Sequence, residues 1–185
     1  GRNAKITLLC DYFARTPDPA RGWALAAITG ELDLKTIKPA MIRALVSERM
    51  DEELFRLSYD YVGDLAETVS LVWPETHGAN YSPTLDEIVD TVQDTPKAKA
   101  PELIAHWLDR LGASERWALL KLVTGGLRIG VSARLAKQAL AKFGGVKAGE
   151  IEELWHGLDA PYEDLFAWLS GEGEKPAPDM SGAFR

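Results

Sequence analysis

The sequence contains little of the chemistry on which most active sites depend. Its 185 residues include one cysteine, Cys10, and three widely separated histidines, His77, His106 and His156. One thiol allows no internal disulfide, and the histidines lack the short helical spacing of a metal site. No apolar run approaches the roughly 20 residues needed to cross a bilayer. We therefore predict no metal site and no membrane segment, and the single thiol favours the cytoplasm.

Nucleophile and nucleotide motifs are also missing. Neither Ser70 nor Ser132 lies in a Gly-x-Ser-x-Gly sequence, and we interpret both as helix caps. The run from Phe143 to Lys147 contains two glycines and a lysine, but not with the spacing of a phosphate-binding Walker loop. The sequence therefore predicts no catalytic residue in this chain.

The sequence does contain a succession of short amphipathic helices, with no credible strand. Asp51 precedes an apolar stripe that ends at Gly63, Thr84 opens a Thr-x-x-Glu capping box, and Ser114 precedes another apolar helix. These patterns predict an all-α fold.

The two ends of the chain indicate how it is organised. Residue 1 is glycine rather than methionine, and Ile6 to Phe13 already form a helical stripe, which suggests a piece of a longer polypeptide. From Gly171 onward the chain is rich in glycine, proline and acidic residues. We predict a helical domain over residues 1–170 and a linker over residues 171–185.

Charge is distributed unevenly along the chain. The net charge is −7, yet residues 1–50 hold eight Lys and Arg against five Asp and Glu, and residues 101–148 hold eight against three. Residues 51–100 hold three against eleven, and residues 149–185 hold two against nine. A polyanion responds to the charge within a Debye length, so the basic segments are compatible with nucleic acid. Alternatively, acidic and basic segments pair with each other inside the fold.

The most informative motif is a glycine-rich turn between two helices. The sequence Lys121-Leu-Val-Thr-Gly-Gly-Leu-Arg-Ile-Gly-Val-Ser132 ends one helix at paired glycines and places Arg128 before the next. Glycine lets a ligand approach the backbone, and a helix start presents free N–H groups at its positive end. The motif predicts contact with phosphate. Two plainer readings remain: Gly125 is an ordinary helix C-cap, or Arg128 pairs with a carboxylate.

An earlier turn repeats part of this motif. Gly63-Asp-Leu-Ala-Glu-Thr-Val-Ser70 aligns with the segment from Gly125 and shares its first Gly, Leu, Val and Ser. Either chance or an internal repeat of two helix-turn-helix halves explains the match. The first copy carries Asp64 and Glu67 in its turn, so only the second suits phosphate.

These motifs resemble the N-terminal DNA-binding domain of ATP-dependent DNA ligases. The similarity is carried by Trp117 to Ala141 with its Leu-Arg-Ile-Gly core, by Gly63 to Glu67, and by Arg2 to Lys5 with Leu8 to Phe13. The tail Ser181 to Arg185 resembles the entry to the adenylation domain. Lys38 to Arg43 and Tyr59 to Gly63 are most similar to bacterial ligases that resemble the eukaryotic and archaeal replication enzymes.

The resemblance implies a compact all-helical domain with approximate two-fold internal pseudo-symmetry, lying across the minor groove of nicked duplex DNA. Such a domain contacts phosphates without reading bases, so its binding is sequence-independent and salt-sensitive. The implied contact residues are Lys121, Thr124, Gly125, Gly126, Leu127, Arg128, Gly130 and Ser132, to which we add Lys5, Lys38 and Arg43.

The same resemblance implies cofactors and partners outside this chain. ATP-dependent ligases adenylate the lysine of a Lys-x-Asp-Gly motif, and none of the ten lysines here begins that pattern. ATP and Mg²⁺ would belong to the parent enzyme, together with the adenylation and OB-fold domains. This chain would bind nicked DNA without a cofactor, as a monomer in a bacterial cytoplasm. The rival hypothesis is a helical adaptor whose tryptophan-bearing grooves bind a partner protein.

Overall fold

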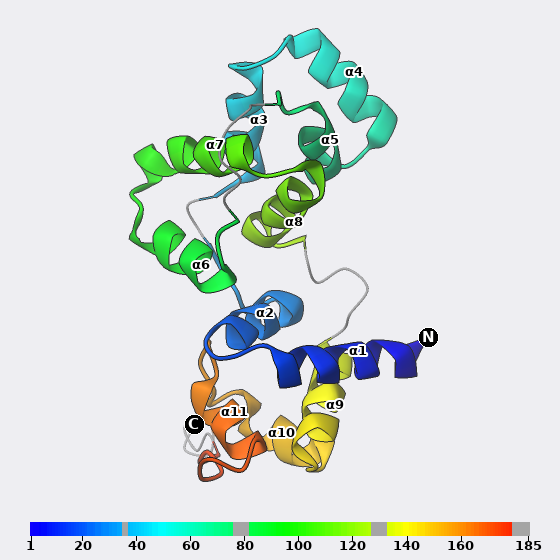
Figure 1. The fold of residues 1–185 in the computed structure, drawn as a ribbon, viewed down its shortest axis with the longest axis vertical. Coiled ribbons are helices and arrows are strands. Elements are labelled where there is room, and N and C mark those ends of the chain that lie inside the picture. The colour runs from blue at the N-terminus through cyan, green and yellow to red at the C-terminus, as the bar shows by residue number, and fades with distance from the viewer. Residues whose placement is uncertain (35–36, 76–81, 127–132, 179–185) are drawn as a thin grey trace, which may run out of the picture. The chain divides into compact units, whose positions relative to one another are not determined.

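Every regular element in the described part of the chain is helical, which confirms the predicted fold class. The computed structural model describes residues 1–34, 37–75, 82–126 and 133–178. The chain divides into two units, one of Gly1–Leu32 with Arg128–Arg185 and one of Asp33–Leu127 (Figure 1). Over the described ranges, no helix is long and apolar enough to cross a membrane. The domain boundary expected at residue 171 stays a prediction.

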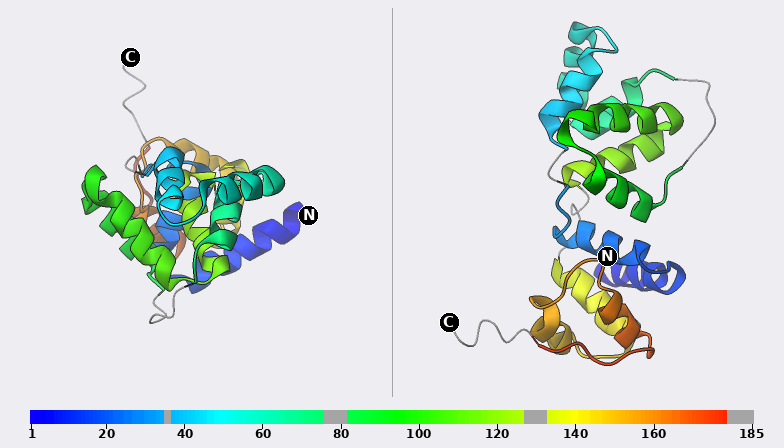
Figure 2. Two further views of the ribbon diagram at one scale, coloured as in Figure 1. Left: turned by 90° about the horizontal axis from the view of Figure 1, so that it is seen from above. Right: turned by 90° about the vertical axis from the view of Figure 1, so that its left-hand side faces the viewer.

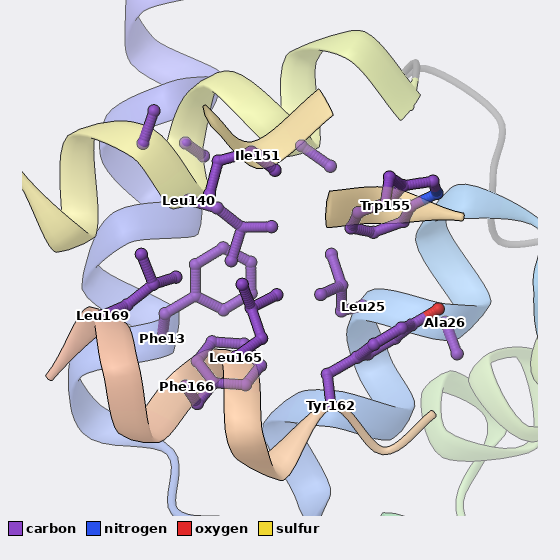
Figure 3. Packing of buried hydrophobic residues seen from close by; sticks show 13 residues of the cluster. Phe13, Leu25, Ala26, Leu140, Ile151, Trp155, Tyr162, Leu165, Phe166 and Leu169 are labelled. Atoms are coloured by element: carbon purple, nitrogen blue, oxygen red, sulfur yellow. The ribbon is translucent and has the colours of Figure 1, made fainter. Parts of the chain in front are cut away.

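The first unit brings helices from both ends of the sequence together. They are α1 (Arg2–Arg15), α2 (Ala20–Thr29), α9 (Ala133–Gly144), α10 (Ala148–Trp155) and α11 (Glu163–Leu169). Helix α1 packs most extensively against α9. The core that these helices share contains aromatic rings. The ring centres of Phe13 from α1 and Phe166 from α11 lie 5.4 Å apart, with Leu140 from α9 beside them (Figure 3). Burying such large rings is the main source of stability for a unit of this size.

The second unit is formed by a continuous stretch of chain. Its helices are α3 (Pro39–Ser47), α4 (Glu52–Val62), α5 (Leu65–Val72), α6 (Leu85–Asp94), the 3₁₀ turn η1 (Lys97–Lys99), α7 (Ala100–Arg110) and α8 (Ala113–Thr124). Helix α5 packs against α8, and α3 packs against α7 and α4 (Figure 2). Val69 of α5 and Leu120 of α8 are fully buried in this packing.

A buried arginine fixes α8 to the end of α5. The side chain of Arg116 is 1% exposed, and its guanidinium donates to the carbonyl of Trp73 at 3.0 Å and to the carboxylate of Glu75 at 2.7 Å. A buried guanidinium needs such acceptors because desolvating an unpaired charge is costly. The N-terminal end of α8 is therefore held in place from within the unit.

Side-chain caps begin several helices of the second unit. Asp51 accepts a hydrogen bond from the Leu54 amide at 3.0 Å, and Thr84 accepts one from the Glu87 amide at 3.3 Å. Each cap satisfies an amide that has no partner inside its helix. The caps predicted at Asp51 and Thr84 are confirmed.

Two predicted serine caps are wrong. Helix α8 begins at Ala113 after an extended Gly112, so Ser114 lies inside its first turn. Ser70 lies inside α5 and donates to the Glu67 carbonyl at 2.8 Å. In α5 the cap is Asp64, and a carboxylate at the helix start fixes the boundary before Ser70 is reached.

The two glycines of the predicted repeat share one backbone conformation. Gly63 ends α4 with φ 78°, and Gly125 ends α8 with φ 81°, both in the left-handed region that glycine adopts without strain. Residues 127–132, which complete the second copy, lie outside the described residues. The two-fold pseudo-symmetry therefore stays a prediction.

Candidate nucleic-acid interface

A hollow in the second unit brings several of the predicted contact residues together. Its volume is about 250 Å³, and we call it the α3–α8 hollow. Its polar lining consists of Arg43 from α3, Tyr59 from α4, Asp64 from the turn before α5, and Lys121 and Thr124 from α8. Segments far apart in the sequence therefore place two cations, a carboxylate and two hydroxyls around one opening.

Arg43 is the cation at this opening that has no acidic partner. Its side chain is exposed, and its guanidinium carbon lies 5.5 Å from the centre of the Tyr59 ring, with Nη2 3.4 Å from the phenol oxygen. Among the described residues it forms no ion pair. Stacking on a tyrosine orients the guanidinium and leaves its charge available to an anion. Lys38, the exposed N-cap residue of α3, precedes Pro39, which also lines the hollow.

Lys121 differs from Arg43 because its charge is already paired. Its ammonium lies 2.6 Å from Oδ2 of Asp64, and its side chain is 12% exposed. The hydrogen bond from Lys121 lowers the pKa of Asp64, and the Glu67 amide that Asp64 caps lowers it further. An ammonium group has three donors, so Lys121 keeps others for a ligand.

One face of α8 leads toward the glycine turn. Trp117, Lys121 and Thr124 follow each other at intervals of four and three residues, which places them on the same side of a helix. Trp117 is 41% exposed, and the Lys121 ammonium lies 6.0 Å from its ring centre. The Thr124 hydroxyl donates its proton to the Leu120 carbonyl. While that bond is intact, the hydroxyl can accept a hydrogen bond from a ligand but cannot donate one.

The two glycines after α8 differ in the structural reason for glycine at each position. Gly125 is a C-cap in the left-handed region, and its amide bonds to the Leu122 and Lys121 carbonyls. A Cβ at Gly125 would meet no atom within 4 Å, whereas a Cβ at Gly126 would lie 2.8 Å from Cδ of Lys121. The C-cap interpretation of Gly125 is confirmed. Close approach of a ligand to this backbone stays a prediction.

The remaining predicted contacts fall elsewhere. Lys5 lies on the exposed side of α1 in the first unit, near the α1–α9 packing in which Arg2 donates to Gln138. Leu127, Arg128, Gly130 and Ser132 lie outside the described residues. The structure therefore unites Arg43, Lys121 and Thr124, and it leaves the roles of the other residues as predictions.

The sequence interpretation missed three members of this site. Asp64 could have been found, because Asp-Leu-Ala-Glu is a capping pattern that places its carboxylate at a helix start. Trp117 shares the helical face of Lys121, and its exposure follows only from the packing of α8. Tyr59 carries no local signal, since its position beside Arg43 depends on how α3 and α4 pack.

Comparison with known families provides independent information. A family model described as DNA ligase N terminus matches residues 1–141, which is more than half of the chain and includes every described residue of the hollow. No curated protein matches the chain.

Proposed function

Because the chain belongs to the family of DNA ligase N-terminal domains, we propose that it binds nicked duplex DNA through the sugar-phosphate backbone along the minor groove. The observation that carries this proposal is the exposed guanidinium of Arg43, which lines the α3–α8 hollow and forms no ion pair with any described residue. Backbone contacts of this kind hold DNA without selecting a sequence.

The predicted contact residues, inside and outside the hollow, have specific proposed roles. Arg43 binds a phosphate through its free guanidinium donors, and Lys38 adds charge at the start of α3. Lys121 donates to a phosphate while remaining bonded to Asp64. The backbone at Gly125 and Gly126 lies against the groove, and Arg128 meets phosphate or sugar beyond it. Lys5 is proposed as a contact from the first unit.

The affinity of the chain by itself is expected to be low. Its net charge is −7, and residues 51–75 hold seven carboxylates against one arginine. Such a surface repels a polyanion within a Debye length. Non-specific DNA binding by a few phosphate contacts falls in the range of about 10⁻⁴–10⁻⁶ M at physiological salt.

The chemistry of nick sealing is assigned to other domains of a ligase. The absence of Lys-x-Asp-Gly means that no lysine here fits as the adenylated nucleophile. We propose that adenylation and OB-fold domains supply that step with ATP and Mg²⁺, and that this chain positions the nicked duplex. A role in bacterial repair or replication belongs to the same proposal.

Fluorescence anisotropy with a labelled nicked duplex tests the DNA-binding role. At low salt we expect Arg43→Ala and Arg128→Ala each to weaken binding by about threefold to tenfold. Each should also reduce by about one the salt slope, which is the slope of log binding constant against log salt concentration. The matched control is Arg56→Ala, because Arg56 is 63% exposed and lies between Glu53 and Asp60 on α4. Arg56→Ala should leave binding unchanged.

Two results would contradict the proposal. One is the absence of binding by the wild-type chain even at low salt, which would favour the adaptor hypothesis. The other is an equal loss of affinity in Arg43→Ala and Arg56→Ala, which would mean that total charge rather than the hollow determines binding.

A further inference from the structure

A second surface of the same unit has the opposite character to the α3–α8 hollow. It is an apolar groove of about 470 Å³ between α4 and α5, lined by Leu57, Ser58, Val62, Thr68, Leu71 and Val72. None of these residues lines the hollow. We call it the α4–α5 groove, and nothing in the proposed DNA-binding role uses it.

Exposed leucines are concentrated at this groove. Leu57 and Leu71, which line the groove, are 54% and 63% exposed, and Leu54, one helical turn before Leu57 on α4, is 56% exposed. Among the described residues, the other exposed large apolar side chains are Leu8, at 67%, and Trp117, at 41%. Contiguous exposed apolar surface on an otherwise polar protein is typical of a site that binds another molecule.

Carboxylates stand one helical turn from the leucines that form the groove. Leu57 has Glu53 four residues before it and Asp60 three residues after it, and Leu71 has Glu67 four residues before it. On a helix these intervals place side chains next to each other. Glu53 and Asp60 are 75% and 63% exposed, and Arg56 between them is their shared cation, at 3.9 and 3.6 Å.

The charge around the groove selects the chemistry of its occupant. DNA and anionic lipid surfaces are repelled by these carboxylates. A groove between two helices accepts the apolar face of a third helix, with large aliphatic side chains as anchors. Lysine or arginine at the edges of that helix would meet Glu53, Asp60 and Glu67.

We propose that the α4–α5 groove docks an amphipathic helix of a partner protein, with leucine-like anchors in the groove and Lys or Arg along both edges. This surface is separate from the proposed DNA contacts, so both ligands can be bound together. The groove would give the domain a protein partner in addition to DNA, and its acidic charge would discriminate against helices with acidic edges.

Two labelled peptides of about 16 residues, roughly four helical turns, test this proposal by fluorescence anisotropy against the full chain. Both carry the same leucine stripe, and they differ only in having Lys and Arg or Glu at the edges. We expect the cationic peptide to bind at least tenfold more tightly and to weaken with salt. Equal binding of both peptides would overturn the charge argument.

Variants locate the binding site. Leu57→Asn together with Leu71→Asn should weaken binding of the cationic peptide at least tenfold, whereas the control Leu8→Asn on α1 should have no effect. Leu8, Leu57 and Leu71 are each more than half exposed, at 67%, 54% and 63%, so neither variant removes a core residue. Full retention of peptide affinity by the groove variant would contradict the proposal.

Two further measurements separate this proposal from its alternatives. Addition of unlabelled nicked duplex should leave the peptide affinity unchanged. Strong competition would show that DNA and the peptide bind to the same surface. Sedimentation velocity should show no concentration-dependent association of the wild-type chain. Association that the groove variant abolishes would instead assign the groove to a second copy of this chain.

Discussion

The ammonium of Lys121 lies 2.6 Å from the carboxylate of Asp64 and joins the end of α8 to the turn between α4 and α5. The same carboxylate accepts the Glu67 amide at 2.8 Å and so begins α5. The two segments whose sequences echo each other, at Gly63 and Gly125, are therefore linked directly through Asp64 and Lys121. Asp64 both caps a helix and neutralises a cation beside the proposed phosphate contacts.

The Lys121–Asp64 pair predicts a pH-dependent contribution to stability. The folded chain lowers the pKa of Asp64 below its ordinary 3.8, so the ionised carboxylate stabilises the fold above that value. The contribution is lost as pH falls through the lower folded pKa. Asp64→Asn keeps a capping oxygen but loses the charge, and it should lower the free energy of unfolding at pH 7.

Urea denaturation at a series of pH values checks this expectation. The difference between wild type and Asp64→Asn should be largest near pH 7 and should shrink toward zero as pH falls below about 4. Asp60→Asn is the control, because Asp60 is 63% exposed and pairs only at the surface of α4. A difference for Asp64→Asn that persists unchanged into acid would show that the charge is not responsible.

Removing the Asp64 charge should also strengthen DNA binding. In Asp64→Asn, Lys121 loses its carboxylate partner and the α3–α8 hollow gains one unit of positive charge. We expect affinity for nicked duplex to rise severalfold at low salt and the salt slope to steepen by about one. Asp60→Asn removes the same charge from outside the hollow, so equal effects of the two variants would attribute the gain to net charge alone.

The helical fold was predictable because its local signals agree. Asp51 and Thr84 cap where the sequence places them, and Gly63 and Gly125 end helices in the left-handed conformation. Ser114 was misplaced because glycine, serine and aspartate all compete to begin helices, and Gly112 does so first.

The site was less predictable because it depends on packing between helices. Lys121 and Thr124 carry a signal as part of the glycine motif. The pairing of Lys121 with Asp64 and of Arg43 with Tyr59 requires α3, α4 and α8 to meet, and no local pattern specifies that meeting. The charge count indicated a basic segment near residue 121, yet one of its cations is neutralised by an acidic segment, as the alternative interpretation allowed.

Trp117 predicts a part of the DNA affinity that does not depend on salt. Its ring is 41% exposed one turn before Lys121, where it can bury apolar surface against deoxyribose. Trp117→Ala should weaken binding about threefold to tenfold, equal to about 0.7–1.4 kcal/mol, with an unchanged salt slope. Trp117→Phe should retain most of the affinity.

Leu71→Ala is the control for Trp117, since Leu71 is equally a large exposed side chain but lies in the α4–α5 groove. It should leave DNA binding unaltered. Tryptophan fluorescence adds a direct readout, because duplex should change the emission of wild type more than that of Trp117→Phe. A salt slope that falls in Trp117→Ala would mean that the substitution disturbs Lys121 instead.

Gly125 allows backbone strain to be separated from ligand contact, because the chain contains a matched glycine. Gly125 and Gly145 have φ values of 81° and 66°, and a Cβ at either meets no atom within 4 Å. Alanine in the left-handed region costs about 1–2 kcal/mol, so both Gly125→Ala and Gly145→Ala should lower stability by similar amounts.

Only Gly125→Ala places its methyl group on the surface proposed to face DNA. We therefore expect Gly125→Ala to weaken nicked-duplex binding by several-fold and Gly145→Ala to leave it intact, when anisotropy is measured well below both melting temperatures. If the two variants lost affinity in parallel with stability, Gly125 would be a helix C-cap alone, and the phosphate contacts would have to come from side chains such as Arg43.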